Sequence, residues 1–315
     1  MAVAHVTAKG GGVVKGVVIA LILLVVVIYL IPIYWVFTSS FKPFTAVTAV
    51  PPKVFFKPEI TSYIKLFTKR SIVRSDEEKQ QRLAKAGWAE LRVLKYGQTI
   101  TGVSPFPARL LNSFLVAIVS TLASTALGTL TAYGFSRFRI KGEADWLFYI
   151  LSTRMMPAVV VTIPLFLMYR FLGLSDTRFG LILLYTVFNL SFATWVMKGF
   201  IDEIPKEYEE AAMVDGYTRF EAFTKIVLPQ AATGIASTMV FCFIFGWNEY
   251  VFALIMTTRK SQTAPPFIPS QLGVGIVDWG VMAAGASIFL IPVVVFTFLL
   301  RKHLLRGVTF GAIRK

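Results

Sequence analysis

The amino-acid sequence predicts an all-α membrane protein with six transmembrane helices. Of its 315 residues, 56% are hydrophobic and only 16% are charged, and the mean hydropathy is +0.67, which is far too apolar for an ordinary soluble domain. Apolar runs long enough to cross a hydrocarbon core of about 30 Å recur along the chain. The net charge is +15, but Lys and Arg are spread between the apolar runs, which disfavours a nucleic-acid-binding protein.

The apolar runs give the expected spans in order. They are residues 13–37, 110–133, 145–168, 179–197, 233–257 and 282–300. The first run could be a secretory signal, because Lys9 and Lys15 precede it, but its uncharged stretch exceeds a usual signal core, so a retained span is favoured. The second run is rich in Ala, Ser, Thr and Gly, which allow helices to pack closely.

The distribution of Lys and Arg indicates that both termini are cytoplasmic. With this orientation, the short cytoplasmic segments carry more Lys and Arg than the short outside segments. Residues 1–12 are then a cytoplasmic N-terminal segment, 38–109 a large external loop, and 301–315 a cytoplasmic C-terminal tail. The polar loop 198–232, between spans four and five, is also cytoplasmic.

The external loop contains one predicted amphipathic helix, from Ser75 to about Gly97. Ser75 and Glu78 have the spacing of a capping box, and apolar residues recur at helical spacing from Ala84 to Leu94. Packing on the outer rim of this chain is the favoured role of the helix. Contact with another protein is the alternative.

The loop 198–232 has the pattern of two short helices joined by a tight turn. Pro205, with acidic neighbours, suits the start of the first helix, and Gly216 suits a left-handed cap at its end. Ala211 and Ala212 have small side chains, so another protein could approach this side of the helix closely.

A second helix is expected to start at a capping box formed by Thr218 and Glu221 and to end at Pro229. From the pattern alone, the alternative is a self-packed connector that lies on the membrane.

Residues 210–229 resemble the EAA signature of permeases of binding-protein-dependent ABC importers. The matching residues are Glu210, Ala211, Ala212, Gly216, Ile226, Leu228 and Pro229. The resemblance implies that the loop is a coupling helix that seats on a separate ATPase subunit. The residues it assigns to this coupling are Glu209, Glu210, Ala211, Ala212, Asp215, Gly216, Ile226, Leu228 and Pro229.

Weaker matches resemble the carbohydrate-uptake branch of this family, in particular the smaller permeases of maltose-type transporters. They include Val50-Pro51-Pro52, Asn112-Ser113, Trp247-Asn248-Glu249 and the tail from Arg306 to Ala312. In that branch the tail reaches the interface between two ATPases, which implies contacts by Gly307, Thr309 and Gly311. Gly307 and Gly311 favour an extended, non-helical path, and a frayed terminus is the alternative.

The resemblance implies a permease subunit of an ATP-driven importer in the bacterial inner membrane, carrying a sugar, polyol or glycoside. Its implied partners are two ATPase subunits, a second permease in a heterodimer, an extracytoplasmic solute-binding protein and membrane lipid. The sequence has no G-x-x-x-x-G-K-S/T phosphate loop, so ATP and Mg are expected on the partner ATPase. No cofactor, metal or catalytic residue is expected on this chain.

Two other transport classes remain as alternatives. One is an ABC permease for a non-carbohydrate solute. The other is a secondary carrier, which would be expected to show internal repeats and a midplane ion site that this sequence does not display.

Polar residues inside the spans are the candidates for a solute path, because such groups are costly in lipid and should face the bundle interior. Arg154 lies at mid-depth of the third span, beside Pro157 and Pro164, which could bend the helix. The other candidates are Asn189, Ser191, Thr194, Trp247, Asn248, Glu249 and Tyr250. The alternative is an internal ion pair of Arg154 with Glu249, together with ordinary interhelical hydrogen bonds.

Overall fold

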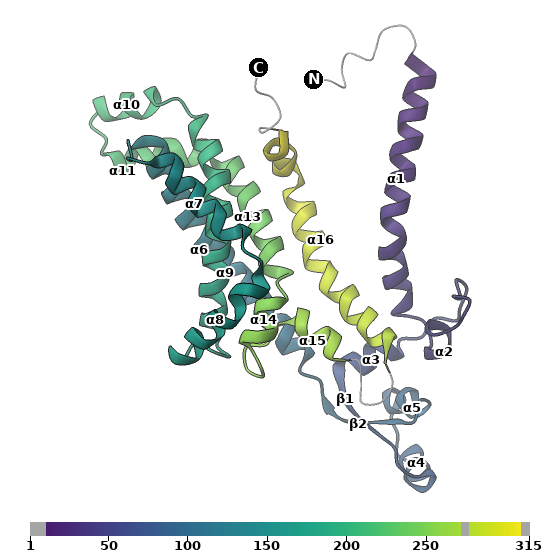
Figure 1. Ribbon diagram of the computed structural model, residues 1–315. Helices are drawn as coiled ribbons and strands as arrows, with labels where there is room; N and C mark the ends of the chain where they lie inside the picture. Colours follow the sequence, from purple (N-terminus) through teal and green to yellow (C-terminus); the bar gives the residue numbers. More distant parts are fainter. Residues whose placement is uncertain (1–10, 272–276, 310–315) are drawn as a thin grey trace. The chain divides into compact units, whose positions relative to one another are not determined.

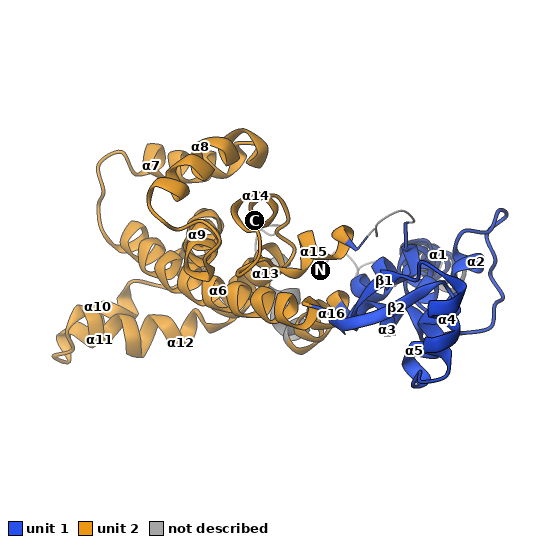
Figure 2. Cartoon of the chain, turned by 90° about the horizontal axis from the view of Figure 1, so that it is seen from below, with its two compact units in different colours: residues 1–104, 271–288 blue, residues 105–270, 289–315 orange. Residues whose placement is uncertain are grey.

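The computed structural model describes residues 11–271 and 277–309 (Figure 1). The chain forms two compact units, each built from two separate stretches of sequence (Figure 2). Unit 1 comprises residues 1–104 and 271–288, and unit 2 comprises residues 105–270 and 289–315.

The first helix of unit 1, α1 (Gly11–Ser39), confirms the expected helix over 13–37. Its segment Val14–Ser39 has a mean hydropathy of 3.2, and none of that segment's most apolar window is buried within the chain. A helix that is apolar on all sides and uncovered by protein is suited to lipid.

The rest of unit 1 before residue 104 is not purely helical, so the all-α prediction is wrong there. Its elements are α2 (Phe44–Val47), α3 (Thr61–Phe67), β1 (Thr68–Ile72), α4 (Asp76–Leu83), α5 (Trp88–Leu94) and β2 (Gln98–Val103). The two strands pair antiparallel, with Thr68 opposite Val103 and Ile72 opposite Gln98. The strands are short, and β1 carries two adjacent charged residues, so the alternation was too weak to predict a hairpin.

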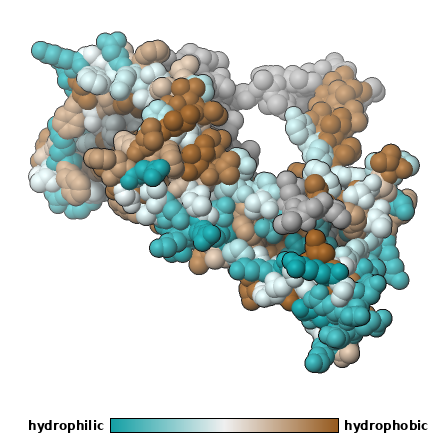
Figure 3. Space-filling model, turned by 60° about the horizontal axis from the view of Figure 1, so that its bottom comes forward, coloured by the Kyte–Doolittle hydropathy of each residue, from teal (hydrophilic) through white to brown (hydrophobic). Residues whose placement is uncertain are grey.

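The single amphipathic helix expected from Ser75 to Gly97 is instead the pair α4 and α5. Helix α5 begins after Gly87, its N-cap, and Gly97 has a φ of +69°. Only half of the expected capping box forms. The Ser75 hydroxyl accepts a hydrogen bond from the Glu78 N–H, but the Glu78 carboxylate accepts one from the Arg74 N–H instead of the Ser75 N–H. The strongly hydrophilic sequence of α4 contributes to the polar face in Figure 3.

Unit 2 is centred on α6 (Phe106–Arg137), α9 (Arg178–Asp202) and α13 (Ala232–Trp247). Helices α6 and α9 pack closely at Gly128. A Cβ at this position would lie only 2.5 Å from the Cβ of Ala193, so only glycine fits there. This packing confirms that small residues in the second span serve helix association. Both helices extend beyond the expected 110–133 and 179–197.

The expected span 145–168 is not one continuous helix. It consists of α7 (Glu143–Met155) and α8 (Ala158–Phe171), which are bent by 91°. Proline disfavours helical geometry in the residue before it, and Met156 accordingly has an extended ψ of 129°. Pro157 therefore breaks this segment, whereas Pro164 lies inside α8 without interrupting it.

The expected span 233–257 is also interrupted. Helix α13 ends at Trp247, and α14 (Val251–Met256) follows after a break. At the break the Asn248 amide donates to the Ile244 carbonyl (2.8 Å), and the Glu249 carboxylate accepts from the Phe252 N–H (2.9 Å). These side chains form hydrogen bonds with backbone groups that would otherwise pair within a continuous helix.

The chain continues through α15 (Ala264–Ser270) to the last helix, α16 (Trp279–Thr309). The extended path expected at Gly307 is wrong, because both Gly307 and the expected contact residue Thr309 lie in this helix. No proline follows Pro292 to stop the helix, and a glycine permits an extended path without imposing one. Gly311 lies outside the described residues.

Four of the described helices are long and apolar enough to cross a membrane, namely α1, α6, α9 and α16. The number rises to six if each of two bent helix pairs is one span, and one of these pairs is α7 with α8.

Candidate functional site

The segment between α9 and α13 forms the expected helix, turn and helix at one end of unit 2 (Figure 1). Its elements are α10 (Glu207–Val214), α11 (Arg219–Ala222), the π-helical turn η1 (Phe223–Val227) and α12 (Leu228–Gln230). Gly216 makes the turn with a φ of +92°, a conformation that favours glycine. The capping box is confirmed, because Thr218 Oγ1 accepts from the Glu221 N–H (3.3 Å) and Glu221 Oε2 accepts from the Thr218 N–H (2.9 Å).

Pro229 does not end the second helix as expected. It lies inside α12, directly after the wider turn η1, and the chain bends by 73° between Gln230 and Ala232 instead. A proline in the first turn of a helix removes no hydrogen bond that the helix needs, so Pro229 fits there. Ile226 and Leu228 are half-buried, and Pro229 is exposed.

Glu209 and Glu210 are neighbours in α10 but lie in opposite environments. Glu209 is only 4% exposed; its carboxylate pairs with the Arg137 guanidinium and accepts a hydrogen bond from the Tyr133 hydroxyl (2.8 Å). Arg137 also donates to the Ile204 carbonyl (2.9 Å). Helix α10 is thereby attached to the C-terminal end of α6, whereas Glu210 is exposed.

Sequence reasoning missed Arg137 and Tyr133 as partners of Glu209. The two charged residues are 72 positions apart, so no local spacing rule pairs them. The only sequence signal was the position of Arg137 at the end of the second span.

A buried apolar cluster supports the same loop. It consists of Ala132, Tyr133, Met197, Ile201, Ile204, Phe223, Val227 and Ala231. The rings of Tyr133 and Phe223 lie 4.6 Å apart, between centroids. Ala212 is also buried, at 6% exposed. Of the two alanines expected to leave room for another protein, only Ala211 is therefore on the surface.

The outer surface of this loop, which we name the α10–α11 tip, combines exposed apolar and acidic residues. It consists of Glu210, Ala211, Val214, Asp215, Gly216, Tyr217 and Phe220. Val214 is 87% exposed and Phe220 is 70% exposed. Exposed apolar residues grouped beside acidic ones are typical of a protein–protein contact.

A second feature of unit 2 is a cleft of about 290 Å³, which we name the unit 2 cleft. It brings together three of the expected path residues, Arg154, Asn189 and Glu249. It also has lining residues that sequence reasoning missed, among them Tyr185, Phe188 and Phe252. These three were indistinguishable in the sequence from ordinary apolar residues of a span.

The alternative ion pair of Arg154 with Glu249 does not form. Within residues 11–271 and 277–309, no carboxylate lies at ion-pair distance from Arg154; its guanidinium instead lies over the ring of Phe245, 4.2 Å from the centroid. Glu249 caps α14 through the Phe252 N–H. Both charged groups therefore line the cleft without neutralising each other directly.

The other expected path residues do not line the cleft. Ser191 hydrogen-bonds Thr153 (3.0 Å), Thr194 is fully buried, and Trp247 donates to the Phe289 carbonyl (3.1 Å) while stacking on its ring. Trp247 therefore serves helix packing. Asn248 and Tyr250 are exposed.

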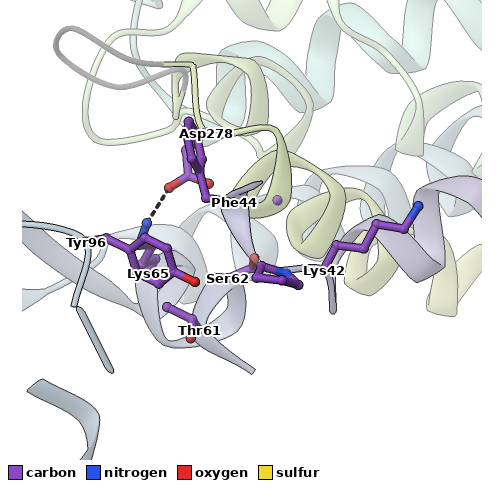
Figure 4. A pocket seen from close by; sticks show the side chains of 9 residues that line it. Lys42, Phe44, Thr61, Ser62, Lys65, Tyr96 and Asp278 are labelled. Atoms are coloured by element: carbon purple, nitrogen blue, oxygen red, sulfur yellow. Dashed lines mark hydrogen bonds and ion pairs between the residues drawn. The ribbon is translucent and has the colours of Figure 1, made fainter. Parts of the chain in front are cut away.

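Unit 1 contains a much smaller pocket, lined by Lys42, Lys65, Tyr96 and Asp278 among others (Figure 4). Its volume of about 10 Å³ has room for about one water molecule. Lys65 Nζ and Asp278 Oδ2, which both line it, pair at 2.8 Å, so these two charged groups already satisfy each other. Among the residues that the structure describes, no group of three His, Cys, Asp or Glu side chains could hold a metal ion.

Comparisons with known proteins agree with these features. The family model for "Binding-protein-dependent transport system inner membrane component" matches residues 124–310. A trehalose transport system permease protein from Mycobacterium tuberculosis is 35% identical over 212 residues, which cover 66% of this chain and 77% of that protein. A trehalose/maltose transport system permease protein from Thermococcus litoralis is 34% identical over 211 residues, covering 66% and 76%.

Among solved structures, a bacterial ABC transporter involved in the import of the acidic polysaccharide alginate has a similar chain. The TM-score is 0.67, and the alignment covers 94% of this chain and 98% of that chain at 22% identity. At this identity, the likeness establishes a shared fold.

Proposed function

Because the chain belongs to the family of binding-protein-dependent transport system inner membrane components, which are multi-pass proteins of the inner membrane, we propose that it is the permease subunit of an ATP-driven importer for a carbohydrate-type solute. The solute class comprises sugars, polyols and glycosides. It is supported by the relatives named for trehalose and maltose transport.

The observation that carries the proposal is the division of roles between Glu209 and Glu210. The α10–α11 tip is the coupling surface: Glu210, Ala211, Asp215 and the Gly216 turn face outward, where a separate ATPase subunit binds them. The other assigned residues, Glu209, Ala212, Ile226, Leu228 and Pro229, position this surface from behind. Two ATPases, which carry ATP and Mg, drive one importer.

The ion pair of Glu209 with Arg137 gives a route for the mechanical step. An ATPase that displaces the α10–α11 tip pulls on the end of α6, because the pair and the Tyr133 hydroxyl join α10 to that helix. Helix α6 in turn packs along α9, so its displacement moves the walls of the unit 2 cleft.

The remaining parts of the assembly follow from this arrangement. Both termini are cytoplasmic, and the C-terminal end, with Gly307, Thr309 and Gly311, contacts the ATPases. A second, different permease completes the membrane pore, lipid surrounds it, and a solute-binding protein delivers the solute from outside. The solute path uses the unit 2 cleft, with Arg154, Asn189 and Glu249 as its polar residues.

Reconstitution in proteoliposomes with the ATPase, the second permease and the binding protein tests the proposal. Glu210→Ala should lower ATP hydrolysis stimulated by the solute-loaded binding protein at least about tenfold. The matched control Glu203→Ala, an exposed acid at the end of α9, should keep the rate within about twofold.

Two results would contradict the proposal. Unchanged stimulation in Glu210→Ala would remove the coupling role of the α10–α11 tip. Solute uptake by this chain alone, without an ATPase, would identify a secondary carrier instead.

A further inference from the structure

The unit 2 cleft is lined by buried polar groups that have no partner in the protein. Tyr185 is 3% exposed, and its hydroxyl makes no hydrogen bond; the same holds for Arg154 Nη1, which is also buried. An unsatisfied buried polar group costs about 1–3 kcal/mol, so such groups are rare in folded proteins. Eleven buried side-chain polar atoms in the described residues have no partner, and these two lie on the wall of the same cleft, where a ligand can supply their partners.

The charges in the cleft restrict the chemistry of this ligand. Arg154 can only donate hydrogen bonds, and the ionised carboxylate of Glu249 can only accept them. A hydroxyl group does both, so a neutral, hydroxyl-rich ring satisfies both residues. The carboxylate of an acidic sugar would be attracted by Arg154. It would also lie close to the Glu249 carboxylate in the same small cleft, and the two negative charges would repel each other.

The apolar side of the cleft fits the same kind of ligand. The rings of Phe188 and Phe252 pack together at 4.5 Å between centroids, and both line the cleft. Ligand sites typically combine such an apolar wall with a few polar groups that fix orientation. The C–H face of a sugar ring can lie on the aromatic pair while its hydroxyl groups reach the polar residues.

The volume sets the size of the ligand. About 290 Å³ is just below the usual range for small-molecule sites, roughly 300–1,000 Å³, and suits a single ring. We propose that the unit 2 cleft is a subsite for one neutral, hydroxyl-rich ring of the transported solute, with Tyr185, Arg154, Asn189 and Glu249 as its hydrogen-bonding residues. The inference rests on the proposed function and adds a ligand-binding role for this subunit.

Tyr185→Phe is the most selective test, because it removes one hydroxyl and keeps the ring. In the complete importer, reconstituted in proteoliposomes with trehalose as the neutral probe, the variant should take up about tenfold less trehalose per ATP hydrolysed. This change corresponds to the loss of one hydrogen bond, about 1.4 kcal/mol. ATP hydrolysis is measured in the same vesicles, so that the ratio of trehalose to ATP separates solute binding from turnover of the ATPase.

The matched control is Tyr169→Phe. Tyr169 is equally buried, at 3% exposed, but its hydroxyl donates to the Gly180 carbonyl and it does not line the cleft. This variant should keep the wild-type ratio of trehalose to ATP. In the absence of solute, Tyr185→Phe should raise the melting temperature and Tyr169→Phe should lower it, because only the second variant loses a hydrogen bond.

A glucuronate-containing disaccharide serves as the acidic probe in the same vesicles. The wild type should prefer trehalose to this probe, and Glu249→Gln should shift the preference toward it. An unchanged trehalose-to-ATP ratio in Tyr185→Phe, or a wild-type preference for the acidic sugar, would overturn the subsite while leaving the importer intact. A wild-type complex with no sugar uptake would overturn the proposed function, and the subsite with it.

Discussion

At the scale of single residues, the ion pair of Glu209 with Arg137 predicts different effects for two adjacent substitutions. Both side chains of the pair are about 95% buried, so Glu209→Gln leaves the Arg137 cation in a buried site without its counter-charge. The variant should lose about 3 kcal/mol of stability, measured by thermal unfolding in detergent. Glu210→Gln, which changes an exposed carboxylate, should leave the melting temperature unchanged. Equal melting temperatures for the two variants would show that the pair does not hold α10.

Asp176, in the loop between α8 and α9, predicts a dependence of stability on pH. Burial alone would raise the pKa of its carboxyl, but hydrogen bonds from the backbone N–H groups of residues 258–261 lower the pKa to about 2. A carboxyl whose pKa is lowered by folding stabilises the protein above its ordinary pKa, near 4, and this stabilisation is lost as the pH falls through about 2.

Asp176→Asn should therefore weaken the decline in stability between about pH 4 and pH 2. Asp176 has a φ of +52°, and Asn tolerates this left-handed conformation, so the backbone should be retained. Acid unfolding followed by circular dichroism measures the effect. The same decline in the variant and the wild type over this range would contradict the assignment.

At the scale of helices, the contact of α6 with α9 depends on Gly128. An added Cβ would lie 2.5 Å from the Ala193 Cβ and 3.0 Å from backbone atoms, so the two helices would have to separate. Gly128→Ala should destabilise the protein by about 1–3 kcal/mol. Gly134→Ala, in the same helix but with nothing within 4 Å, should stabilise it by about 0.5–1 kcal/mol through helix propensity. Thermal unfolding should show a lower melting temperature for Gly128→Ala and a higher one for Gly134→Ala. A loss of stability in both variants would contradict the packing argument.

Much of the helix arrangement could be predicted from the sequence, because apolar length is a strong signal. Helices α1, α6, α9 and α16 follow from uninterrupted apolar runs. Pro157 signalled a bend in the third span, but the sequence did not show that only this proline, and not Pro164, would break the helix. The hydrogen bonds at the break near Asn248 are visible only in three dimensions. The hairpin of β1 and β2 was missed because its pairing joins residues about 30 positions apart.

The candidate site was predictable only where its residues are close in sequence. The Gly216 turn and the capping box at Thr218 are local patterns, and both were found. The Arg137 partner of Glu209 and the unpartnered hydroxyl of Tyr185 depend on distant segments, and both were missed.

At the scale of the whole molecule, Asp278 joins the two stretches of sequence that make up unit 1. Its carboxylate pairs with Lys65 at 2.8 Å (Figure 4). It also pairs with Arg70 at 3.5 Å, and the Lys65 and Asp278 side chains are 5% and 11% exposed. Asp278→Asn would leave two largely buried cations without a counter-charge. It should cost about 3–5 kcal/mol and make residues 68–103 more accessible to trypsin.

Lys95→Gln is the control for this prediction. Its amino group pairs with Glu59 at 2.9 Å, but the Lys95 side chain is 61% exposed, so the change should cost at most about 1 kcal/mol. Equal tryptic cleavage in the two variants would show that Asp278 does not hold unit 1 together.

The pairing of Lys65 with Asp278 also has a consequence for biosynthesis. The two residues are 213 positions apart, and a ribosome adds about 5–20 residues per second, so roughly 10–40 s pass before Asp278 is made. All of unit 2 before α16 emerges during this interval, while the earlier stretch of unit 1 lacks its counter-charge. A nascent chain that stalls before residue 278 therefore carries a unit 1 in which Lys65 and Arg70 lack their counter-charge.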